Sequence, residues 1–307
     1  MPQPTTRTAH RTHPARVLAY PESRFARLAG VEVHHEVHGD AAAPALLLSH
    51  HFYGSTRTWR QVTSDLARDH LVTAFDRPGF GLTERPRRPW NGAEPPYRRA
   101  TAARIGWELL DHLDVERAVL VGCSAGGTNV LEMYAQRPER VRALVLISPA
   151  ITGDVGPPAA VRPLLRTPPL RAVGPRLVRR LAGEIDAQRV SRSWFDPSRA
   201  TAETAEPYRR MLQVDRWDEG LWEAVTAEPP PDLRPVLRRV DVPTLVLAGD
   251  HDPVIAPHWN RRTAAAIPGA RYRPVEQCGH TPQEERPGAV VRAIRAFLSD
   301  VERGTGS

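Results

Sequence analysis

Short runs of consecutive apolar residues alternate with amphipathic stretches along most of the chain. The apolar runs occupy residues 45–49, 71–75, 118–122, 143–148 and 244–248. Residues 31–38 and 271–276 have the mixed apolar and polar pattern of further strands, and residues 59–68, 101–113, 127–136 and 290–302 have helical spacing. Uninterrupted apolar runs of this length are typical of parallel strands that are buried on both faces of a sheet. The pattern therefore predicts an α/β fold with a doubly wound, mostly parallel sheet.

The alternation stops between about residues 151 and 240, where Pro and Arg are frequent and apolar residues recur with helical spacing. We therefore expect a helical cap at residues 153–239, inserted into an α/β core that consists of residues 21–152 and 240–307. Open α/β sheets bind ligands at the carboxyl ends of their strands, so the cap should cover that edge. Trp194, Trp217 and Trp222 are candidates for an apolar pocket ceiling, or they form the core of the cap.

The amino-acid composition limits the classes of protein to which this chain can belong. The hydrophobic content of 41% suits a globular protein with a core. The chain has no apolar run of 18 residues, which argues against a membrane-spanning helix. Residues 1–16 are polar and lack the apolar region of a secretory signal. We therefore expect a flexible tail at residues 1–20 and a cytoplasmic protein.

The formal net charge is +7, and all 42 basic residues are arginine. They are scattered, and no arginine block alternates with aromatic residues, so we expect neither a nucleic-acid nor a membrane partner. A small-molecule substrate is the expected ligand, and the oligomeric state is left open. The two cysteines, Cys123 and Cys278, are too few for a disulfide scaffold, and we expect free thiols.

The most specific motif is Gly-Cys-Ser-Ala-Gly at residues 122–126, which fits G-x-S-x-G. It lies between a predicted strand and a predicted helix, as expected for a turn that presents a nucleophilic serine. Ser124 is thus the candidate nucleophile, and the alternative is an ordinary glycine-rich turn. His280 follows the last predicted strand and is the candidate base. Asp250 and Asp252 follow the strand at residues 244–248, and either could orient that base.

Five segments in this order resemble the alpha/beta hydrolase superfamily. They are VEVHHEVHGD, SHHFYGSTRTW, FDRPGFGLTERP, GDHDPVIAP and GHTP, in addition to the serine motif. The resemblance implies a catalytic triad of Ser124, Asp252 and His280, with Asp252 rather than Asp250 as the acid. It implies an oxyanion hole formed by the backbone N–H groups of Phe52 and Ala125. It also implies that the enzyme needs no cofactor and no metal.

The sequence departs from the family pattern at two positions. His51 stands where the family has glycine after the loop histidine, and it either packs there or points into the pocket as a second imidazole. Cys123, beside the serine, is either a reactive thiol or a small buried side chain, and we favour the second interpretation. The residues His34, Glu36 and His38 share one face of a predicted strand, but no further metal ligand is apparent. Asp76 is interpreted as a turn residue.

The resemblance favours a capped serine hydrolase that cleaves a small, largely apolar ester through an acyl-enzyme. Alternatives on the same fold are hydrolysis of a C–C bond and a lyase or cofactor-free haloperoxidase-like activity. A non-catalytic protein that binds a small molecule is the alternative from another class. Because Ser124 precedes the cap and both partners follow it, we expect the core sheet to assemble the triad without the cap.

Overall fold

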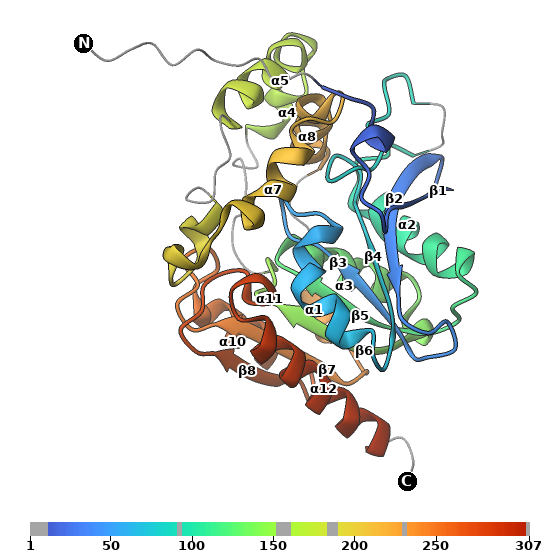
Figure 1. Cartoon of the computed structure of the whole chain (residues 1–307), viewed down its shortest axis with the longest axis vertical. Coiled ribbons are helices and arrows are strands. Elements are labelled where there is room, and N and C mark those ends of the chain that lie inside the picture. The colour runs from blue at the N-terminus through green and yellow to red at the C-terminus, as the bar shows by residue number, and fades with distance from the viewer. Residues whose placement is uncertain (1–11, 91–93, 152–160, 183–189, 229–231, 305–307) are drawn as a thin grey trace.

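The core of the protein is one sheet of eight strands in the order β1-β2-β4-β3-β5-β6-β7-β8. The computed structural model describes residues 12–90, 94–151, 161–182, 190–228 and 232–304. The strands are β1 (Arg24–Leu28), β2 (Val31–His38), β3 (Ala45–Ser49), β4 (Leu71–Phe75), β5 (Ala118–Cys123), β6 (Val141–Ile147), β7 (Thr244–Gly249) and β8 (Arg271–Val275). β1 and β2 are antiparallel to their neighbours, and the pairs from β4 to β8 are parallel (Figure 1). The predicted doubly wound, mostly parallel sheet is confirmed.

Helices cover both faces of this sheet. They are α1 (Arg60–Leu66), α2 (Arg99–His112), α3 (Ala125–Gln136), α9 (Arg234–Leu237), α10 (Pro257–Ala265), α11 (Pro282–Glu285) and α12 (Pro287–Gly304). The apolar residues of α2, α3, α9 and α10 pack on one face, and those of α1 and α12 pack on the other. The central strands are buried along their whole length, which explains why they consist of continuous apolar runs.

The predicted elements are present with small shifts at their ends, and the elements that were missed include β1, α10 and α11. β1 is an edge strand with the sequence RFARL, and its exposed arginines conceal the strand pattern. The short helices α10 and α11 lie in segments for which the sequence analysis predicted no helix. The first predicted helix begins as a 3-10 turn, η2 (Thr56–Trp59), and continues as α1.

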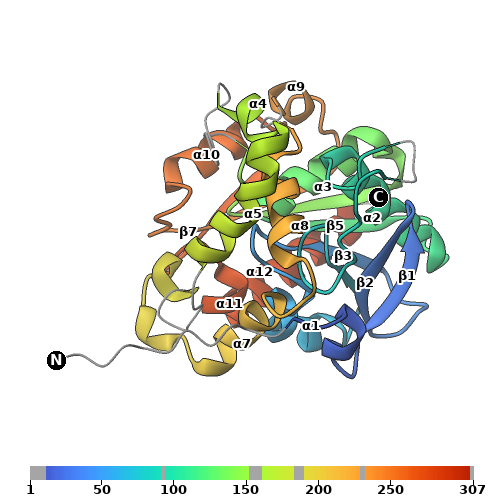
Figure 2. The same ribbon diagram turned by 90° about the horizontal axis from the view of Figure 1, so that it is seen from above.

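Between β6 and β7 the described residues form helices and short turns. The helices that precede α9 here are α4 (Arg162–Leu165), α5 (Pro168–Ala182), α7 (Ala202–Met211) and α8 (Trp217–Thr226). We call the described residues 161–182 and 190–228 the insertion; it contributes no strand to the sheet. Viewed from above, α5 and α8 lie across one end of the sheet (Figure 2). Tyr208, Met211, Leu212, Trp217 and Leu221 pack with Phe80 in a small apolar cluster of their own.

Two predicted boundaries need correction. Leu233 and Leu237 belong to the apolar cluster of the sheet, so the chain has returned to the core before residue 240. Residues 12–20 were predicted to be a flexible tail, but they pack on the insertion. His13 pairs with Val214 in a β-bridge, and Tyr20 donates a hydrogen bond to Glu206 of α7. Residues 1–11 lie outside the described residues.

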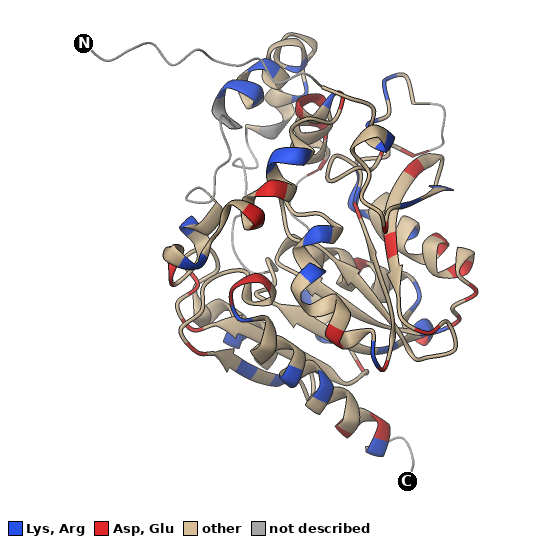
Figure 3. Cartoon of the chain, viewed as in Figure 1, with Lys and Arg blue, Asp and Glu red and all other residues tan. Residues whose placement is uncertain are grey.

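Arginine and acidic positions are distributed over all parts of the molecule rather than gathered on one element (Figure 3). Many of them form ion pairs, such as Arg16 with Glu32 and Arg271 with Asp300. The dispersed pattern agrees with the scattered arginines of the sequence. Within the described ranges, no helix is long and apolar enough to cross a membrane.

Candidate active site

Ser124 lies in a strained turn between β5 and α3. Its φ of 51° and ψ of −116° are rare for a residue with a side chain. A Cβ atom at Gly122 would lie 2.4 Å from the carbonyl oxygen of Gly126, and one at Gly126 would lie 2.0 Å from the carbonyl oxygen of Ser49. The turn can therefore form only because glycines stand two residues before and two residues after the serine.

The structure brings Ser124, His280 and Asp252 together in one hydrogen-bonded chain. His280 Nε2 lies 2.9 Å from Ser124 Oγ, and His280 Nδ1 lies 2.8 Å from Asp252 Oδ2. All three residues are more than nine-tenths buried. They follow the carboxyl ends of three parallel strands, β5, β7 and β8, which is why residues far apart in sequence meet here. This is the geometry of a nucleophile, a base and an orienting acid.

Asp252 is held by the backbone as well as by the histidine. Its Oδ1 accepts hydrogen bonds from the N–H groups of Val254 (2.8 Å) and Ile255 (2.9 Å). Since Oδ1 is occupied, Oδ2 is left to accept the Nδ1 proton of His280. Asp250 does not reach His280; its Oδ1 accepts from His251 Nδ1 at 2.7 Å and from the N–H of Cys278 at 3.2 Å.

The insertion contacts the loop that carries His280. The N–H of His280 donates to the carbonyl of Ser193 at 2.8 Å, and Trp194 Nε1 donates to Thr281 Oγ1 at 2.8 Å. Glu285 is buried and bridges the same two segments, because it accepts from the N–H of Gly279 (2.7 Å) and of Asp196 (2.9 Å). The insertion thus adds contacts to the loop that carries His280, and the expectation that the core sheet assembles the triad without it stays a prediction.

Sequence reasoning missed Glu285 and Ser193. Glu285 acts through a carboxylate on residues that are distant from it in the sequence, and Ser193 acts only through its backbone carbonyl. A surface glutamate would give the same local sequence pattern, and any residue can supply a carbonyl. Neither residue type nor spacing could have identified them.

The loop after β3 lies over the start of α3. Ser49 is in register with Gly122, and the carbonyls of Ser49 and His50 are the nearest neighbours of Gly126. Ala125, one predicted oxyanion donor, is the first residue of α3, and Phe52, the other, belongs to this loop. The loop is thus close to the Ser124 turn.

His50 and Arg77 hold the peptide that contains the N–H of Phe52. The carbonyl of that peptide, on His51, accepts from His50 Nδ1 at 2.7 Å and from Arg77 Nη2 at 3.2 Å. His50 Nε2 accepts from the N–H of Arg77 at 3.1 Å, so one ring nitrogen donates and the other accepts. Burial, followed by the charge of Arg77, lowers the pKa of His50 well below its ordinary value, which keeps this ring neutral. The C=O and N–H bonds of a trans peptide group point in opposite directions. The contacts that fix the carbonyl of His51 therefore also fix the direction of the Phe52 N–H.

His51 and Cys123 are both buried. His51 is 7% exposed and contacts the backbone of Phe52, Tyr208 of α7 and Glu284 of α11. Its φ is not positive, and the positive φ of this loop falls on Tyr53 (66°). Cys123 is fully buried in the apolar cluster under α1 and α12, and burial raises the pKa of its thiol. Both Cys123 and Cys278 are free thiols.

The three tryptophans named as pocket candidates lie in different environments. Trp194 is hydrogen-bonded to Thr281 beside His280. Trp217 is part of the small apolar cluster of the insertion. Trp222 packs against Gly174 of α5 and lines a cleft of about 650 Å³ beside the loop after β4. That cleft is lined by six arginines and three carboxylates and by none of the three residues of the Ser124 chain.

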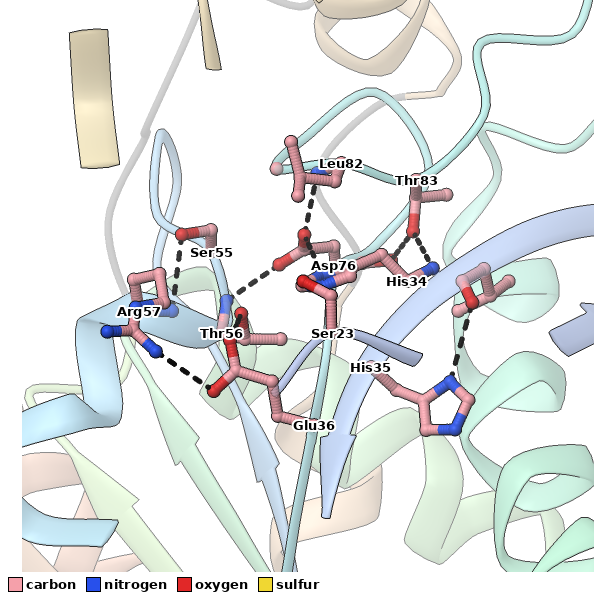
Figure 4. A network of polar contacts seen from close by, with 12 residues as sticks. Ser23, His34, His35, Glu36, Ser55, Thr56, Arg57, Asp76, Leu82 and Thr83 are labelled. Atoms are coloured by element: carbon pink, nitrogen blue, oxygen red, sulfur yellow. Dashed lines mark hydrogen bonds and ion pairs between the residues drawn. The ribbon is translucent and has the colours of Figure 1, made fainter. Parts of the chain in front are cut away.

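Asp76 lies just before the turn after β4, and it is also the centre of a buried polar network (Figure 4). Its carboxylate accepts from the N–H of Thr56 (2.6 Å), from the N–H of Leu82 (2.7 Å) and from His34 Nδ1 (2.7 Å). Burial alone would raise the pKa of Asp76, but His34 and these donors hold it below its ordinary value. Asp76 therefore ties the end of β4 to the segment that follows the Phe52 loop.

The side chains considered as metal ligands belong to the same region. Glu36 accepts from Thr56 Oγ1 at 2.8 Å, and His38 lies 3.4 Å from Glu36. His34 is occupied by Asp76 and by Ser23 at 2.7 Å. No group of three or more His, Cys, Asp or Glu residues suited to a metal ion occurs in the described part of the chain.

Comparisons with known proteins agree with this architecture. The family model described as alpha/beta hydrolase fold matches residues 44–287. The chain is 30% identical over 253 residues to 2-hydroxymuconate semialdehyde hydrolase of Pseudomonas sp. (strain CF600), which covers 80% of this chain and 82% of that relative. It is 25% identical over 271 residues to 3-oxoadipate enol-lactonase 2 of Acinetobacter baylyi, covering 87% and 93% of the two chains. The solved enol-lactonase from Burkholderia xenovorans LB400 is similar, with a TM-score of 0.68 and 27% identity over 90% of this chain and 100% of that one.

Proposed function

This chain belongs to the alpha/beta hydrolase family, and we propose that it is a serine hydrolase in which Ser124 is the nucleophile, His280 the base and Asp252 the orienting acid. The observation that carries the proposal is the continuous hydrogen-bonded chain from Ser124 Oγ through His280 to Asp252 Oδ2. The strained backbone at Ser124 adds support, because strain at a buried turn is commonly retained where the chemistry needs it.

The contacts support one direction for each proposed proton transfer. Asp252 keeps the Nδ1 proton on His280, so Nε2 is free to take the proton of Ser124 as Oγ attacks the substrate carbonyl. The N–H groups of Phe52 and Ala125 stabilise the oxyanion that forms. When the intermediate collapses, His280 returns the proton to the leaving group, and an acyl-enzyme remains on Ser124. Water, deprotonated by His280, then hydrolyses the acyl-enzyme and restores the serine.

The proposed substrate is a small, largely apolar ester or lactone. Similarity to the enol-lactonase of Acinetobacter baylyi supports an ester-like bond. The second candidate is hydrolysis of a C–C bond beside a carbonyl with the same three residues, which the similarity to the semialdehyde hydrolase of Pseudomonas supports. Both reactions use the same nucleophile, so one set of variants tests the mechanism and a substrate panel separates them.

The test is Ser124→Ala in a screen of p-nitrophenyl esters of graded acyl length, together with labelling by a fluorophosphonate probe. We expect the wild type to be labelled and the variant to lose both labelling and at least about a thousandfold in kcat, as for other triad members. Ser198→Ala, at an exposed serine outside the site, is the matched control and should behave like the wild type.

If the fluorophosphonate probe labels the wild type but no ester is turned over, ketone substrates of the C–C hydrolase class should be tested next. Absence of labelling, with the fold intact by circular dichroism, would refute the serine mechanism. That result would favour a non-catalytic binding protein on this fold.

A further inference from the structure

A buried chain of polar contacts joins the Phe52 loop to the insertion and to the helix after His280. His51 Nδ1 lies 2.6 Å from the carbonyl oxygen of Phe52, and His51 Nε2 lies 3.1 Å from the hydroxyl of Tyr208 in α7. The Tyr208 hydroxyl donates to Glu284 Oε2 of α11 at 2.8 Å. His51, Tyr208 and Glu284 are 7%, 9% and 3% exposed, so these contacts are sheltered from water.

The number of protons in this chain follows from its donors and acceptors. A carbonyl oxygen can only accept, so His51 Nδ1 must carry a proton to bond to Phe52. Tyr208 has a single proton, which it donates to Glu284, and its oxygen can then accept only from a protonated Nε2 of His51. Burial, followed by the Glu284 carboxylate, raises the pKa of Tyr208 well above its ordinary value, so Tyr208 keeps its proton. With Glu284 ionised, every contact is satisfied when both nitrogens of His51 are protonated.

The charges around His51 fit an imidazolium. The Glu284 carboxylate lies 3.6 Å from His51 Nε2 and supplies the opposite charge. Arg60 of α1 lies 3.7 Å from the other oxygen of Glu284, and Arg77 donates to the carbonyl of His51 rather than to its ring. Thr58 Oγ1, at 3.4 Å from Nε2, is a further polar neighbour without charge. A buried imidazolium is stabilised when a carboxylate and a hydroxyl meet it in this way.

We propose that His51 is a positioning residue for the oxyanion loop, which as an imidazolium holds Phe52 through Nδ1 and joins it through Tyr208 to helix α7 of the insertion. This proposal rests on the proposed function, because it concerns the donor that stabilises the oxyanion. His50 and Arg77 fix the peptide before Phe52, and the His51 ring fixes the peptide after it. At the position where the family has glycine, the His51 side chain thus links the direction of the Phe52 N–H to the position of the insertion.

Three substitutions at His51 separate its two contacts. The amide nitrogen of Asn stands in the position of Nδ1 and can still donate to the Phe52 carbonyl. The amide nitrogen of Gln stands nearer the position of Nε2 and retains only the contact with Tyr208. Gly, the residue of the family pattern, retains neither.

We expect His51→Gly and His51→Gln to lower kcat for a responsive ester by about a hundredfold, the usual cost of a misplaced oxyanion donor, while KM changes less than about threefold. His51→Asn should recover kcat to within about fivefold of the wild type, because the Phe52 contact is restored. The control His258→Asn makes the same change at an exposed histidine on α10 and should leave both constants unchanged. If the Gly, Gln and Asn variants had equal kcat values and equal melting temperatures, the positioning role would be overturned.

The protonation of His51 gives a readout that does not depend on activity. In ¹⁵N NMR spectra at neutral pH, the His51 ring should show protons on both nitrogens, with its signals assigned by their loss in His51→Asn. Tyr208→Phe removes the acceptor for Nε2 and should remove the second proton. A wild-type His51 with one bare nitrogen would refute the proposed network. If the wild type shows no Ser124-dependent turnover, the proposed function fails, and these spectra still decide whether the imidazolium exists.

Discussion

Replacing Asp252 by Asn changes one atom at the point where the site selects the tautomer of its base. The side chain already accepts two backbone hydrogen bonds at Oδ1, from Val254 and Ile255. The introduced amide must keep its oxygen there, because the NH₂ group would otherwise face two N–H donors. The NH₂ group is then directed at His280 Nδ1, which lies 2.8 Å from Asp252 Oδ2 in the wild type. His280 must therefore accept at Nδ1 and carry its proton on Nε2.

A base with its proton on Nε2 cannot take the proton of Ser124, 2.9 Å away. In a serine protease with this arrangement the same change lowers kcat by about ten-thousandfold, and we expect a loss of that order, about 5.5 kcal/mol of transition-state stabilisation. The substitution is isosteric and both backbone hydrogen bonds remain, so the melting temperature should change little. The assay is kcat for the best p-nitrophenyl ester from pH 6 to pH 9, with the melting temperature measured in parallel.

The matched control is Asp250→Asn, two residues away in the same loop. Asp250 contacts His251 and the N–H of Cys278 rather than His280, so we expect its kcat to stay within about tenfold of the wild type, or about 1.4 kcal/mol. A loss of less than tenfold for Asp252→Asn, or a larger loss for Asp250→Asn, would show that the tautomer argument is wrong.

Two further predictions concern the buried polar groups. Glu285→Gln leaves one side-chain oxygen for the two N–H donors of Gly279 and Asp196, so we expect the free energy of unfolding to fall by about 1–3 kcal/mol. We also expect a lower kcat, because the loop that carries His280 loses a contact with the insertion. Urea unfolding and kinetics measure both effects, and unchanged values would contradict the bracing role. Burial lowers the pKa of His35 from 6.5 to about 4, so between these pH values the unfolded chain binds a proton that the folded chain excludes. As the pH falls from 6.5 to 4, the free energy of unfolding should therefore decrease by about 1.4 kcal/mol per pH unit. Urea midpoints between pH 7 and pH 4 should fall less steeply in His35→Gln, and parallel slopes for variant and wild type would refute this assignment.

The sequence alone determined the class of fold and the residues that meet at the Ser124 turn. The strands β3, β4, β5 and β7 are continuous apolar runs because both of their faces are covered, and this pattern is local and visible. The glycines at positions 122 and 126 are likewise local, since each is required by a contact inside one short turn. His280 and the pair Asp250 and Asp252 could be named because their positions after successive parallel strands bring them to the same edge of the sheet, and the family resemblance selected Asp252.

Only the tertiary structure decided which buried polar residues support Ser124, Asp252 and His280. Asp76, Glu285 and His51 are each held by partners from distant segments, and although the sequence singled out His51 as a departure from the family pattern, it did not show these partners. The contribution of the insertion to the His280 loop is made by the backbone carbonyl of Ser193, which no residue type reveals. A polar side chain is stable in the interior only if its partners are present, and whether they are present depends on how distant segments pack. For that reason the hydrophobic pattern predicted the sheet, while the polar network around the site became visible only once the chain was folded.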